Sequence, residues 1–363
     1  MRDKRLDIIK ALAIIMMVAF HARAPEIFSS FGYLFHMGVF FVVAGWLFDF
    51  RHSEGLSAIA TYVKKKIVRL WFPVAFWTLL GVLFHNFLLD WNVISDCQMD
   101  VVIDANSVSE RWSVSQLVRQ LTYVPFMVAD GSQLCGAFWF LQSLFFVTTG
   151  YCIASQLLRL LGVDVLVSQT VLSLILLVVA RYVNVPCISY IGGSHTLTAY
   201  ALLHMGVLFR RFDMNVQNLR RRTVVVIGAL CFLLLVLLRS QGRISLAANS
   251  YPSCLFLLVC TSCGFFLLDS VTALIPAKLG AVLAYLGRRT MPILILHFAA
   301  FKLVNAVLVW WHHAPVCRRA EFPVTYSGGC WWIAYLIVGM TAPLLLYELY
   351  GRIIRGCEVA AEG

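Results

Sequence analysis

Long apolar segments alternate with short polar ones along almost the whole chain. Most are about 20 residues long, which is the length that a helix rising 1.5 Å per residue needs to cross the hydrocarbon core of a bilayer. The pattern therefore predicts an all-α, polytopic membrane protein with about ten transmembrane helices. The predicted spans are residues 6–23, 31–50, 67–89, 137–160, 163–183, 195–212, 223–240, 251–272, 291–311 and 330–351.

Composition agrees with lipid as the solvent of this chain. Of its 363 residues, 61% are hydrophobic and only 13% are charged, whereas soluble domains are nearer 45–50% apolar and about 25% charged. A soluble α/β enzyme and a disordered chain are excluded. The spans leave no room for a separate soluble domain, so residues 1–363 are predicted to form a single membrane domain.

The net charge of +11 would suggest a nucleic-acid partner, but the basic residues lie between apolar segments, where they set topology instead. With a cytoplasmic N-terminus, ten spans place twenty of the 29 lysines and arginines inside. The charge pattern therefore predicts ten spans with both termini cytoplasmic. We expect a multi-pass protein of the cell (plasma or inner) membrane. The start of the chain imitates a secretory signal, but Asp7 and Lys10 interrupt its apolar run, and we expect 1–24 to be retained as the first span.

The longest loop, residues 90–136, is predicted to face outward and is acidic. Its moderately apolar stretch 117–128 fits either a lid or interfacial helix over the site, or a solvated loop. The one C-x-x-C pair, Cys260 and Cys263, lies in an apolar span without histidine partners, so no metal site is expected.

Ionisable side chains inside spans are costly and therefore functional candidates. Lys10 and His21 are eleven residues apart, or about three helical turns, which places them on one face about 16 Å apart. This spacing suits acyl-coenzyme A, with its phosphates near Lys10 and its extended arm reaching His21. The alternative is a snorkelling lysine and an interfacial histidine.

Two further groups extend this pattern. His36, at the outer end of the second span, is predicted to converge with His21 at a similar depth, and a neutral histidine is a natural general base. Lys66 and Arg69 share a helical face at the inner end of the third span, where they would bind phosphates or only anchor the span. His204 and Glu348 also lie within spans, where functional and pairing roles are both open.

Five segments, in order along the chain, resemble motifs of the acyltransferase-3 family of integral membrane acyltransferases, which includes glycan O-acetyltransferases. They are DIIKALAIIMMVAFH (7–21), FHMGVFFVVAGWLF (35–48), KKKIVRLWFP (64–73), FWFLQSLFF (138–146) and LGRRTMPILILHF (286–298). The family usually has proline at the place of Gly38 and serine at the place of Ala44. These two departures leave the histidines in place.

The resemblance implies transfer of an acyl group, most often acetyl, from a coenzyme A thioester to a hydroxyl of a glycan or lipid-linked sugar, with acyl-CoA as co-substrate and no bound cofactor. A polytopic transporter or flippase of a lipid-linked glycan is the alternative; an inactive scaffold is a third. His21 would act as general base or carry the acyl group. The predicted site residues are His21 and His36 for catalysis, Lys10, Lys66 and Arg69 for the donor, and Asp7, Trp139 and His297 for acceptor or supporting roles.

Overall fold

The computed structural model describes residues 3–94, 110–127, 133–183 and 191–361, without the side chains of 353–361. Within these ranges the chain is built from helices, and its only extended pairing is a bridge between Ser245 and Ser250. The predicted all-α fold is confirmed. The long helices are α1 (Lys4–His21), α8 (Phe138–Leu160), α9 (Val165–Tyr182), α10 (Ser194–Arg211), α11 (Arg221–Leu238), α12 (Cys254–Leu274), α14 (Thr290–Trp311) and α15 (Trp331–Ala361).

Eight of the ten predicted segments correspond to helical segments that are long and apolar enough to cross a membrane. Two of the eight are composite. The second segment consists of α2 (Glu26–Gly32) and α3 (His36–Trp46), so its break makes His36 the first residue of α3. The third consists of α4 (Leu56–Lys66), a turn of π-helix at Ile67–Trp71 and α5 (Phe72–Leu83).

The predicted start of this third span at residue 67 is wrong, because the helix begins at Leu56. Lys64–Lys66, which precede the predicted start, lie inside the helix. α6 (His85–Asp90) follows α5, and two further helices, α7 (Val114–Tyr123) and α13 (Ala277–Arg288), lie outside the predicted spans.

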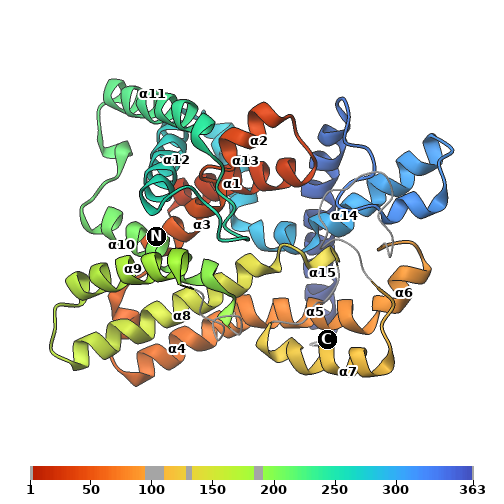
Figure 1. The fold of residues 1–363 in the computed structure, drawn as a ribbon, viewed down its shortest axis with the longest axis horizontal. Helices are drawn as coiled ribbons and strands as arrows, with labels where there is room; N and C mark the ends of the chain where they lie inside the picture. Colours follow the sequence, from red (N-terminus) through yellow and green to blue (C-terminus); the bar gives the residue numbers. More distant parts are fainter. Residues whose placement is uncertain (1–2, 95–109, 128–132, 184–190, 362–363) are drawn as a thin grey trace.

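The two remaining predicted spans are α1 and α10, both helices of 18 residues. α1 contains four charged residues, and α10 carries two histidines and two arginines. Neighbouring helices cover both, since α1 packs against α3, α12, α13, α14 and α15, and α10 against α3, α8 and α9. Figure 1 shows α1 in the middle of the fold, among α3, α12 and α13. Protein neighbours rather than lipid surround these two helices, which explains their polar content.

The helix in the long outer loop, α7, packs beside α5 (Figure 1). Leu117 and Leu121 of α7 join Ala75 and Val82 of α5 in a small apolar cluster. No described residue of 110–127 lines either of the two cavities presented below. In the described part of the loop, therefore, α7 is a helix against α5 and not a cover of the site.

Two glycines let α3 and α10 touch backbone to backbone. A Cβ atom at Gly45 of α3 would overlap the Leu203 carbonyl, and one at Gly206 of α10 would overlap the Val42 carbonyl. Small residues allow this approach where no hydrophobic effect drives helices together. The contact fixes α3, which carries His36, against the rest of the bundle.

We expect Gly45→Ala or Gly206→Ala to lower the free energy of unfolding by about 1–3 kcal/mol, because the added methyl overpacks a helix contact. Unfolding in a denaturing-detergent titration measures this. Gly150→Ala in α8 is the matched control, since a Cβ there meets nothing within 4 Å and alanine is the better helix former. Equal stability of the three variants would contradict the proposed close contact.

Candidate active site

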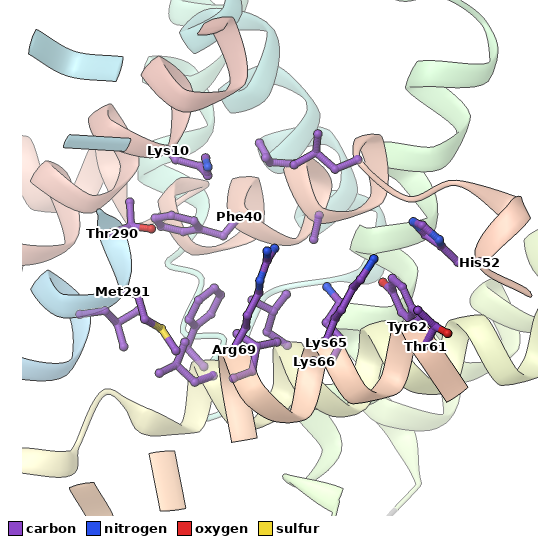
Figure 2. A pocket seen from close by; sticks show the side chains of 18 of the residues that line it. Lys10, Phe40, His52, Thr61, Tyr62, Lys65, Lys66, Arg69, Thr290 and Met291 are labelled. Carbon is purple, nitrogen blue, oxygen red and sulfur yellow. The ribbon is translucent and has the colours of Figure 1, made fainter. Parts of the chain in front are cut away.

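A cavity of about 940 Å³ lies between α1, α3, α4, α8 and the start of α14. Four basic side chains line it: Lys10 from α1, Lys65 and Lys66 from α4, and Arg69 from the π-helical turn. Figure 2 shows Lys65, Lys66 and Arg69 pointing from their helix into this space, toward the side where Lys10 lies. We call it the donor cavity, after the donor-binding role that the sequence predicts for Lys10, Lys66 and Arg69.

The four cations are not equivalent. Lys10 Nζ is 2.8 Å from Asp7 Oδ1, and Asp7 is buried, so much of the Lys10 charge is neutralised. Among the described residues, no carboxylate lies within 4.0 Å of Lys65, Lys66 or Arg69. The cavity therefore presents a positive wall made mainly by α4 and its π-helical turn. Sequence reasoning selected Lys66 and Arg69 but missed Lys65 as a site residue.

An aromatic pair closes one end of the donor cavity. The rings of His52 and Tyr62 stack with centroids 4.8 Å apart, and Lys66 Nζ lies 5.0 Å from the Tyr62 ring centroid. Burial lowers the pKa of His52, and the charges of Lys65 and Lys66 lower it further against the opposing effect of Asp49. His52 is therefore neutral near pH 7 and offers a flat face. The apolar lining of the cavity includes Phe40, Phe140 and Met291.

A second, smaller cavity of about 180 Å³ contains the histidines, and we call it the histidine chamber. His21 at the end of α1, His36 at the start of α3 and Trp139 at the start of α8 all line it. Residues Ile244–Ala247, from the loop between α11 and α12, complete the wall. The structure thus brings together in one cavity three residues that were selected from the sequence.

His297 of α14 contacts His21 directly. His21 Nδ1 and His297 Nε2 are 2.9 Å apart, and His297 Nδ1 faces the carbonyl oxygens of Leu294 (2.9 Å) and Ile293 (3.2 Å). A carbonyl only accepts, so His297 Nδ1 carries the hydrogen and Nε2 a lone pair. His21 Nδ1–H must then donate to His297, which leaves the lone pair of His21 on Nε2.

His36 is oriented in a separate way. Its Nδ1–H donates to the Gly32 carbonyl at 3.0 Å, so its Nε2 also carries a lone pair. The rings of Phe20 and Tyr33 pack edge-on around it. The side chain that hydrogen-bonds to His21 is therefore His297, whereas His36 bonds to the backbone.

The donor cavity and the histidine chamber lie along the same helix, α1. This helix is continuous from Lys4 to His21, so Lys10 in one cavity and His21 in the other are about 16 Å apart along its axis. Leu294 of α14 lines both cavities. A phosphate held by the basic wall and a group at His21 can therefore belong to one extended ligand.

Other intramembrane polar residues have structural partners. His204 is bonded to Tyr151 Oη and Thr170 Oγ1, each at 2.8 Å, and Glu348 is 2.6 Å from Arg289. Of the two roles left open by the sequence, the structure shows a pairing role for both His204 and Glu348.

Sequence reasoning missed a buried ion pair, Arg5–Asp269, with Nη1 and Oδ2 2.8 Å apart. The pair ties α1 to α12, and an acidic residue inside span 251–272 was the available signal. The described residues contain no group of three or more histidine, cysteine or acidic side chains suited to a metal ion.

Comparison with known proteins identifies one family model that covers nearly the whole chain. A family model described as an acyltransferase domain matches residues 3–348. No curated protein and no solved structure matches this chain.

Proposed function

This chain belongs to the acyltransferase-3 family, and from that premise we propose that it moves an acyl group from acyl-coenzyme A to a hydroxyl of a glycan or lipid-linked sugar. As a multi-pass membrane acyltransferase it needs a site for a charged donor and a base within the bundle. The observation that carries the proposal is the alignment of the donor cavity and the histidine chamber along α1.

The donor cavity has the chemistry that coenzyme A requires. Lys65, Lys66 and Arg69 offer charge to its phosphates, and Arg69 adds a planar donor fork that matches a phosphate. The stacked faces of His52 and Tyr62 suit a purine ring. The extended arm would then run beside α1 toward His21, which places the thioester in the histidine chamber.

In the chamber, His21 Nε2 takes the proton of the acceptor hydroxyl. The hydroxyl oxygen attacks the thioester carbonyl, a C–O bond forms, the C–S bond breaks, and the proton passes from His21 to the departing thiolate. His297 Nε2 accepts a hydrogen bond from His21 Nδ1–H throughout, and this bond strengthens when His21 is an imidazolium.

The acceptor is proposed to arrive from the opposite side to the donor. In the predicted topology of a plasma (inner) membrane protein, the loop that contains Ile244–Ala247 is extracytoplasmic, and this loop walls the chamber. Trp139 in the same wall offers an aromatic face for a sugar ring. His36 Nε2 is a second group available to an acceptor hydroxyl.

Transfer of label from acyl-coenzyme A tests this function. Membranes from cells with the gene should incorporate [14C]acetyl from acetyl-CoA into a glycan or glycolipid fraction, and membranes lacking the gene should not. Mass spectrometry of surface glycans should show one acyl mass lost without the gene. Glycans that keep their acylation but fail to reach the surface would indicate a transporter instead.

A further inference from the structure

Leu294 occupies the junction between the two cavities. Among the described residues it is the one that lines both the donor cavity and the histidine chamber. It is buried on α14, one turn before His297, and its carbonyl oxygen accepts the hydrogen bond from His297 Nδ1 at 2.9 Å. The same residue therefore borders the path of the donor and holds the partner of the proposed base.

The two cavities differ about fivefold in size, since the donor cavity measures about 940 Å³ and the chamber about 180 Å³. The chamber is thus the more confined of the two spaces. The acyl chain must share this room with the hydroxyl-bearing carbon of the acceptor.

We propose that Leu294 determines acyl chain length, and that it restricts transfer to short acyl groups such as acetyl. This inference rests on the proposed function. An acyl group reaches His21 by passing from the donor cavity into the chamber, and Leu294 borders both. Interiors are close-packed and yield little to added volume, so each methylene beyond the fitting length should encounter Leu294 or the chamber wall.

Chain-length competition is the direct test. Full-length enzyme in membranes is offered acetyl-, butyryl- or hexanoyl-CoA labelled in the acyl group, with the glycan fraction of gene-deleted cells as acceptor. One methylene too many in an apolar pocket lowers kcat/KM by about 10–200-fold. We therefore expect the wild type to prefer acetyl over hexanoyl by at least this factor, and Leu294→Ala to narrow the preference by about tenfold or more.

Two matched variants isolate the junction. Met291→Ala removes a side chain of similar size from the same helix, but one that lines only the donor cavity, so it should leave the chain-length preference unchanged. Leu294→Phe adds bulk at the junction and should lower acetyl transfer while the KM for acetyl-CoA stays near that of the wild type. If the Leu294→Ala protein does not accumulate, Leu294→Val removes less of the side chain and should narrow the preference for acetyl in the same direction.

An unchanged preference in an active Leu294→Ala or Leu294→Val enzyme would overturn the inference, as would a wild type that uses hexanoyl as readily as acetyl. The inference would also be overturned if Met291→Ala changed the chain-length preference as much as Leu294→Ala does. A wild type that transfers no acyl group from any of the three donors would instead refute the proposed function itself, so the two failures are distinguishable.

Discussion

Replacing His21 with alanine is expected to reduce acyl transfer by about 10²–10⁴-fold, the usual loss when a general base is removed. The hydrogen-bond chain through His297 leaves the lone pair of His21 on Nε2, and His21 lines the histidine chamber. The substitution truncates the last residue of α1, so helix packing should tolerate it. The measurement is the rate of label transfer from acetyl-CoA, normalised to the amount of folded protein in the membrane.

Variants of His297 and His36 identify which histidine does the chemistry. His297→Gln keeps an acceptor oxygen for His21 Nδ1–H and should therefore retain more activity than His297→Ala. If His297 positions the base, the pH–rate profile of His297→Gln should also be shifted from that of the wild type. His36→Ala should cost less than His21→Ala. If His21→Ala keeps most of the activity and His36→Ala loses it, the base is His36 and the assignment is reversed.

A rapid-quench experiment separates base catalysis by His21 from a covalent route. Both routes use the Nε2 lone pair of His21, but only the covalent one forms an acyl-imidazole. Rapid quench followed by mass spectrometry of the peptide that contains His21 should show no added acyl mass under the general-base mechanism. A trapped acyl group on His21 would contradict that mechanism while leaving His21 as the catalytic residue.

What the sequence predicted well is local. The apolar segments are long and depend on nearest-neighbour composition, so the all-α membrane fold followed directly from them. The spacing of Lys10 and His21 is fixed by one continuous helix, α1. The prediction that His21 and His36 meet needed only a short connection between two helices, and both line the histidine chamber.

What it missed depends on contacts between residues distant in sequence. The His21–His297 hydrogen bond joins positions 276 residues apart, and Arg5–Asp269 joins positions 264 residues apart. No periodicity reports such pairings. The predicted start at residue 67 is wrong for a different reason, because the apolar pattern begins only after the charged residues Lys64–Lys66. In the structure, Lys65 and Lys66 belong to α4 and line the donor cavity. A run of charged residues can therefore lie within this helix.

Replacing the basic residues Lys66 and Arg69 of the donor cavity with alanine is expected to weaken the binding of acyl-CoA strongly. A charge-assisted contact to phosphate contributes roughly 1.5–3 kcal/mol. Arg69→Ala should therefore raise the KM for acyl-CoA by about tenfold or more, and Lys66→Ala combined with Arg69→Ala by about a hundredfold. Arg69→Lys should fall between wild type and alanine, because it keeps the charge but loses the planar fork.

Lys64→Ala is the matched control for this prediction. Lys64 belongs to the same basic run, but it is exposed and does not line the donor cavity, so its loss should leave the KM for acyl-CoA near the wild-type value. Lys10→Ala should change KM less than Arg69→Ala, because Asp7 already neutralises much of the Lys10 charge. It should lower the amount of folded protein instead, since it removes one partner, at 2.8 Å, of a buried carboxylate. If the Lys66 and Arg69 variants bind acyl-CoA as well as the Lys64 variant does, then these residues only orient the span in the membrane, and the phosphates of the donor bind elsewhere.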